Sequence, residues 1–226
     1  MSELRLLSLD TSGETFSLAL TQGSTLVAES LSGQPRSHLV QLFPQLVVML
    51  QQAGWSPQQL DGVAVTVGPG SFTGLRTGLL LAKSLGQSLN LPCYGVDTLE
   101  ALACNLFDCP NVVACLDARK GEVAWAHFAV QNGLARPLSP QRLDSPAEFA
   151  RAVPAQSVVL GGGCQPALEF LRQRSDLVVA PADLWRVRAS SLARQARTLV
   201  RSKAASHWSK LRPEYVRPAD VQVHRG

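Results

Sequence analysis

The chain has 226 residues, of which 46% are hydrophobic and 17% charged, and its formal net charge is +4. This length allows one large or two small globular domains, and no apolar run approaches the roughly 20 residues of a membrane span. Five cysteines without Cys-x-x-Cys and four histidines without ligand spacing argue against disulfides and against a metal site. The first strand begins almost at the N-terminus and leaves no room for an export signal, so we expect a cytoplasmic protein.

The predicted elements form two successive series of strands and helices. Hairpins on an α/β pattern, occurring twice, indicate two lobes with related mixed sheets flanked by helices. We place the boundary near residues 100–110, which gives an N-terminal lobe over 1–105 and a C-terminal lobe over 106–226. The stretch 136–154 reads as a loop with a short helix. The expected strands are Leu4–Leu9, Thr15–Leu20, Thr25–Leu31, Val63–Val67, Cys93–Val96, Val112–Leu116, Val123–Val130 and Val158–Leu160.

The first predicted helix, over residues 37–54, is unusually apolar. Apolar residues recur at helical spacing and form a stripe along one side, and Gly54 marks the end of the helix. Further valines lie outside this stripe, so the apolar surface of the helix is wider than one core-facing side. No Asp, Glu, Lys or Arg occurs between Ser37 and Leu60. Loss of charge with gain of aliphatic side chains is typical of interface cores. The stripe consists of Leu39, Leu42, Phe43, Leu46, Met49 and Leu50.

A strand end, a Gly-Pro-Gly turn and a second helix make up the block over residues 67–76. Ser71 is a good N-cap with Phe72 as the first apolar helical residue, and the amides of such a helix start can hold an anion. A tight strand-to-helix connection without a ligand is the alternative. Neither P-loop nor Rossmann spacing fits the block.

Small residues recur every four positions along this second helix. Such a row allows another helix to approach closely, although the neighbour can equally be the protein's own sheet or helix. Together the two helices favour a surface for a protein partner. The residues we assign to that interface are His38, Leu39, Leu42, Phe43, Leu46, Met49, Phe72, Gly74, Leu75, Gly78 and Ala82.

The positive charge is concentrated near the C-terminus, where residues 184–226 contain ten Lys or Arg against Glu214 and Asp220. A basic helix there attracts polyanions such as nucleic acid. A solvated surface helix, or a docking face for an acidic protein, is the alternative, and aromatic residues that would stack on bases are sparse. The candidate contacts are Arg194, Arg197 and Arg201.

Six sequence blocks together resemble the bacterial TsaB (also called YeaZ) family. The block of residues 68–76 beside the first-strand motif is the most specific, and the match is dense in the N-terminal half and patchy beyond it. The other blocks are weak alone. The matching blocks are Leu9–Ser12, Ser37–His38, Gly68–Arg76, Asp97–Ala103, Asp117–Val123 and Pro213–Arg217.

The resemblance implies an actin/Hsp70-like α/β fold of two lobes and a part in tRNA threonylcarbamoyladenosine synthesis. The family's members pair with the transferase TsaD through helices of the first lobe, with TsaE as a further component, and self-associate when TsaD is absent. In the complex with TsaD, the TsaB-family protein is the non-catalytic subunit, so we expect no catalytic residue and no metal in this chain. His38 is followed at the fourth position by Leu42 instead of the second histidine of TsaD. Contact with tRNA would be made through the complex.

The superfamily resemblance also implies a candidate nucleotide site at the turn between the first two strands. The turn between the first two strands has Ser12 where the superfamily pattern has Gly, and a side chain there crowds a phosphate. We expect no cofactor on this subunit, with ATP in the assembled complex. An independent ATPase, kinase or peptidase of the same superfamily is the alternative function. The candidate nucleotide contacts are Asp10, Thr11, Ser12, Gly161 and Gly162.

Overall fold

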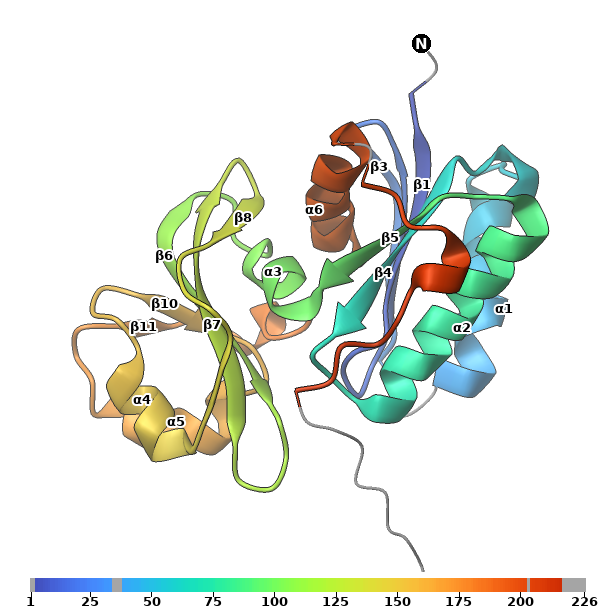
Figure 1. The fold of residues 1–226 in the computed structure, drawn as a ribbon. Coiled ribbons are helices and arrows are strands. Elements are labelled where there is room, and N and C mark those ends of the chain that lie inside the picture. The colour runs from blue at the N-terminus through green and yellow to red at the C-terminus, as the bar shows by residue number, and fades with distance from the viewer. Residues whose placement is uncertain (1–2, 34–37, 203, 217–226) are drawn as a thin grey trace, which may run out of the picture.

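The computed structural model describes residues 3–33, 38–202 and 204–216. The chain forms two lobes side by side, and each is built on one β-sheet with helices packed against it (Figure 1). This arrangement confirms the two-lobed α/β fold with two mixed sheets flanked by helices that the sequence led us to expect.

The first sheet has five strands in the order β3-β2-β1-β4-β5. Its central strand β1 pairs antiparallel with β2 and parallel with β4, and the apolar run of β1 is buried because the sheet is covered on both faces. The antiparallel β1–β2 and β2–β3 pairs are the hairpins predicted for this lobe, although β3 pairs with β2 and not with β1. The strands are β1 (Arg5–Asp10), β2 (Ser17–Gln22), β3 (Thr25–Leu31), β4 (Gly62–Gly68) and β5 (Cys93–Asp97).

Helices cover both faces of this sheet. Helices α1 (His38–Gln52) and α2 (Phe72–Leu89) pack on one face, with the short helix η1 (Pro57–Gln59) between α1 and β4 in the chain. Helix α6 (Ala189–Arg201) covers the opposite face, as Figure 1 shows. The sheet is therefore the middle layer of three.

The second sheet has six strands, with β11-β10-β6-β7-β8 in order and β9 paired to β7. Helices α4 (Pro146–Ala152) and α5 (Cys164–Arg172) lie together on it. Strand β8 ends inside the stretch 136–154 predicted as a loop with a short helix, and β9 lies wholly inside it. Both are short strands that pair with β7. The strands are β6 (Cys109–Asp117), β7 (Val123–Gln131), β8 (Leu134–Pro137), β9 (Arg142–Asp144), β10 (Val158–Leu160) and β11 (Val178–Val179).

The chain returns to the first lobe after the second sheet is complete. The Ser17 hydroxyl donates to the Val187 carbonyl at 2.9 Å, and the Ser190 amide donates to Glu29 at 2.8 Å. The segment after α6, with the short helix η3 (Trp208–Lys210), runs back along α2 (Figure 1). Residues 189–202 and 204–215 therefore pack on the first lobe, although a boundary at 105/106 assigns them to the second.

One hydrophobic core joins the two lobes. Helix α3 (Thr98–Ala103) and α6 supply buried side chains to a cluster that includes residues from both sheets. Leu102 of α3 and Leu192 of α6 are completely buried in this cluster. Members from the two sheets include Leu6, Ala64, Val96, Val112, Ala114, Phe128 and Leu160.

Asp97 directly precedes α3, and burial raises its pKa. Its side chain accepts a hydrogen bond from the Glu100 amide at 2.9 Å and so caps the helix. Burial, which disfavours the charged form, raises the pKa of Asp97 to about 7, and the charges of Glu100 and Glu214 act in the same direction.

We predict that Asp97→Asn makes the protein more stable at alkaline pH. The folded state keeps the proton up to about pH 7, whereas the unfolded chain releases it near pH 3.8, so wild-type stability falls as pH rises between these values. Asn still caps the helix but has no charge to bury. The gain at pH 8 should reach up to about 4 kcal/mol and vanish near pH 4. Denaturant unfolding at several pH values measures it, and a gain independent of pH would contradict it.

Candidate functional site

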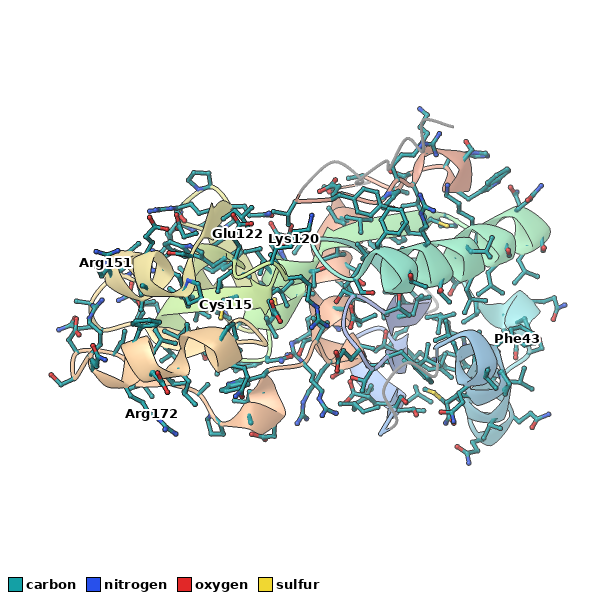
Figure 2. The ribbon with its side chains drawn as sticks, turned by 90° about the horizontal axis from the view of Figure 1, so that it is seen from below. Phe43, Cys115, Lys120, Glu122, Arg151 and Arg172 are labelled. Atoms are coloured by element: carbon teal, nitrogen blue, oxygen red, sulfur yellow. The ribbon has the colours of Figure 1, made fainter. Side chains whose placement is uncertain are left out.

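A cleft of about 1190 Å³ lies where the two lobes face each other. The first lobe contributes the β1–β2 turn and the start of α2, and the second contributes the β6–β7 turn and the glycine turn after β10. In open α/β sheets, ligands bind outside the carboxyl ends of the strands, which is where β1 and β4 end here. Figure 2 shows Lys120 and Glu122, on the β6–β7 turn, near the junction of the lobes.

The Asp10 carboxylate at the floor of this cleft is used to hold the protein together. Its Oδ1 accepts from the Ser12 amide at 3.1 Å, from the Ser12 hydroxyl at 2.7 Å and from the Thr66 hydroxyl at 2.7 Å. Asp10 is 4% exposed. It therefore ties β1 to β4 and fixes the turn that follows.

The other candidate nucleotide residues divide between the cleft and the interior. Ser12 and Gly162 line the cleft together with Asp10. Thr11 is fully buried, and its hydroxyl donates to the Gly74 carbonyl at 2.8 Å. Gly161 has φ +119°, and a side chain there would collide with the Cys115 carbonyl, so it serves the packing of the turn. We therefore correct the assignment of Thr11 and Gly161: both are structural residues and not ligand contacts.

An ion pair crosses the mouth of the cleft. Arg119 of the β6–β7 turn lies 2.9 Å from Glu14 of the β1–β2 turn, and Asp117 lies 3.6 Å from the same guanidinium. Because these side chains are largely exposed, the pair contributes less than about 1 kcal/mol. Sequence reasoning missed this contact, since it joins residues 105 positions apart.

The apolar stripe predicted for the partner interface points into the core. Leu42, Leu46 and Met49 are 1–3% exposed because α1 packs this side on the first sheet, and we correct their assignment to core residues. Phe43 is 59% exposed and keeps its place on the surface. The side chains of His38 and Leu39 lie outside the part that the structure describes.

The exposed side of α1 is also apolar. Val40 is 76% exposed, and Val47 and Val48 are 37% and 42% exposed, so with Phe43 and Pro44 they form a surface without charge. Leu80 on α2, which is 67% exposed, adds to the apolar surface of this lobe. We call Val40, Phe43, Val47 and Val48 the α1 face. Figure 2 places Phe43 at one end of the molecule, with Arg151 and Arg172 of the second lobe at the other.

The small residues of α2 face the protein's own first strand. A side chain added at Gly74 would collide with the Thr11 carbonyl, and one at Gly78 would collide with the Thr11 hydroxyl. Leu75 and Ala82 are fully buried on the same side. These four residues are corrected from the partner interface to the contact between α2 and the sheet. Phe72, 40% exposed, remains at the surface.

The basic helix α6 is used mainly for packing. Arg194 donates to the Cys104 carbonyl and to the Ser191 hydroxyl, and Arg197 donates to the Gly23 carbonyl at 2.9 Å. Burial, and the charges of Arg194 and Arg201, lower the pKa of Arg197. We therefore correct the assignment of Arg194 and Arg197 from tRNA contacts to residues that hold α6 in place. Arg201 is exposed.

The comparisons with known proteins agree on one family. A family model described as "TsaD: tRNA N6-adenosine threonylcarbamoyltransferase" matches residues 26–179, which is more than half of the chain. This chain belongs to that family. The resemblance to TsaB (YeaZ) is confirmed by its relatives and by its structural neighbours.

Two relatives are tRNA threonylcarbamoyladenosine biosynthesis proteins TsaB. The protein of Bacillus subtilis is 34% identical over 62% of this chain and 61% of its own length. The protein of Escherichia coli is 36% identical over 55% of each chain. The match thus spans little more than half the length of these curated relatives. The structure of YeaZ from Pseudomonas aeruginosa aligns over 94% of this chain and all of its own, with a TM-score of 0.84 and 28% identity.

Over residues 3–33, 38–202 and 204–216, no group of three or more His, Cys, Asp or Glu is arranged to bind a metal ion. Among the helices of the same ranges, none is long and apolar enough to cross a membrane. All five cysteines are free thiols.

We predict that Gly74→Ala destabilises the protein, although alanine is the better helix former by about 1 kcal/mol. The added methyl group would collide with the Thr11 carbonyl and force α2 away from β1. Overpacking of this kind should lower the free energy of unfolding by about 1–3 kcal/mol. Ser84→Ala, on the exposed side of α2, is the control and should be neutral or slightly stabilising. Equal stability of Gly74→Ala and wild type would show that the contact is looser than described.

We also predict that Asp10→Ala lowers the free energy of unfolding by about 3 kcal/mol, since it leaves the buried Ser12 and Thr66 donors without their acceptor. Asp10→Asn keeps one acceptor oxygen and should cost less. Chemical denaturation measures both variants, with Glu14→Gln on the same turn as the control. A fully stable Asp10→Ala protein would contradict the structural role.

Proposed function

We propose that this chain is a non-catalytic subunit of the machinery that makes threonylcarbamoyladenosine in tRNA, and that it pairs with a TsaD-type transferase through its first lobe. Family membership and the TsaB relatives support the pathway. The observation that carries the pairing is the exposed and uncharged α1 face. Contact with tRNA and with a TsaE-type ATPase would then occur in the assembled complex, in the cytoplasm.

The α1 face has the chemistry of an interface core. Soluble monomers rarely expose contiguous large apolar patches, and such patches mark sites of association. Charged residues are depleted from interface cores, and helix α1 and the segment after it have none up to Leu60. The buried stripe of the same helix holds α1 rigidly on the sheet, so the face is preformed.

The TsaD relationship favours a homologous partner. In a pair of homologous subunits, the same helices of both chains can meet and form a bundle. The same face would close on a second copy of this chain when the transferase is absent, which gives a symmetric dimer. Covering Val40 and Phe43 would remove the largest exposed apolar side chains of α1 from water.

The cleft supports a second candidate function, binding of a nucleotide or a similar small molecule. Its volume and its place at the strand ends favour this candidate. Two features oppose it: Asp10 is engaged by Ser12 and Thr66, and Ser12 has a side chain where the superfamily pattern has glycine. Calorimetric titration of this chain alone with ATP and Mg²⁺ tests it.

We predict that Phe43→Glu abolishes pairing with the transferase and leaves the monomer folded. The side chain is exposed in the free protein, whereas a charge in a buried interface remains unpaired. The loss of affinity should be at least about 2 kcal/mol, or roughly thirtyfold. Val47→Glu should behave alike. Co-purification and calorimetry with the transferase measure both variants.

The matched control is Phe170→Glu on α5, which changes an equally large exposed residue of the other lobe and should leave affinity unchanged. Leu46→Glu should unfold the protein, because that side chain is buried in the core. If Phe43→Glu and Val47→Glu both bind the transferase as tightly as wild type, the α1 face is not the interface.

A further inference from the structure

The segment after α6 is a strap that lies across the first lobe; we use this name for residues 204–216. It begins with an antiparallel bridge in which Ser206 and Cys93 exchange two backbone hydrogen bonds. Leu211 then anchors it, being 3% exposed in the core of the first lobe. Further on, the Glu214 amide donates to the Val67 carbonyl at 2.7 Å. The strap therefore runs from the start of β5 to the end of β4, beside the start of α2 (Figure 1).

Three side chains hold the end of the strap. The Tyr215 ring stacks on Phe72 with centroids 4.9 Å apart, and the Arg76 guanidinium lies 3.8 Å from the Phe72 centroid. Arg76 also donates to the Tyr215 hydroxyl at 3.2 Å. Gly68 allows the close approach, since a side chain there would collide with the Glu214 carbonyl.

This cluster of Phe72, Arg76 and Tyr215 belongs to two surfaces at once. Tyr215 and Phe72 line the cleft. Phe72 and Arg76 are exposed at spacing i and i+4 on α2, and Leu80 continues the same row one turn further. A protein that covers this row would press on the rings that hold the strap over the cleft.

We propose that Tyr215 is a latch that couples the partner-binding side of the first lobe to the cleft. The inference rests on the proposed pairing with a transferase. When the partner covers Phe72, water is excluded from the ring stack, and the strap end is held more firmly on β4. The wall of the cleft is then fixed by a protein bound outside it, and the cleft changes its opening with the assembly state.

Hydrogen exchange of the Glu214 amide reports directly on the latch, because this amide exchanges only when its bond to Val67 opens. In the free protein, Tyr215→Ala should speed exchange of peptides covering 212–216 by roughly tenfold, since the ring stack is lost. Tyr215→Phe keeps the stack without the hydroxyl and should remain close to wild type. Exchange in Tyr215→Ala at the wild-type rate would overturn the latch.

The second arm adds the TsaD-type transferase and measures binding and exchange in the same samples. Wild type should slow exchange at 212–216 by roughly tenfold on binding, whereas Tyr215→Ala should bind and show no such slowing. If the transferase binds wild type and exchange at 212–216 is unchanged or faster, the coupling is wrong. If the transferase does not bind wild type, the proposed function fails, and the free-protein arm still decides whether Tyr215 holds the strap.

Discussion

The close contact between α2 and β1 determines where the functional surfaces of this protein lie. Gly74 and Gly78 bring the helix against Thr11, at the point where β1 ends and the turn toward β2 begins. The start of α2 is thereby placed at the cleft, beside Ser12. Since the small side of the helix is used inside the lobe, its other side, with Phe72 and Leu80, is what remains for association.

Helix α1, like α2, packs one side on the sheet and leaves the other side exposed. Its regular apolar stripe packs on the sheet, and its irregular extra valines are the ones that reach water. An apolar helix without charge thus contains both a core-facing side and a face for a partner. The core side makes the exposed face rigid, so that binding orders little that was not already ordered.

The sequence predicted strands β1–β7 and β10, the cap at Ser71 and the apolar character of α1, because these depend on local pattern. It misassigned Leu46 and Gly78, since periodicity shows that one side of a helix is apolar but not which neighbour covers it. The arginines of α6 were misread for a related reason: a positive charge in a sequence does not reveal that its guanidinium holds a backbone carbonyl. Contacts such as Tyr215 with Phe72 join distant positions and have no local signal.

The core shared by α3 and α6 has a consequence for motion. Two-lobed proteins that close on a ligand need a hinge surrounded by few buried contacts, so that rotation of the lobes costs little free energy. Here Leu102 and Leu192 sit in the middle of the junction, and rotation would open a dry interior to solvent at about 25 cal/mol for each Å². The shared core therefore opposes rotation of the halves, and adjustment around the cleft costs less in the peripheral segments.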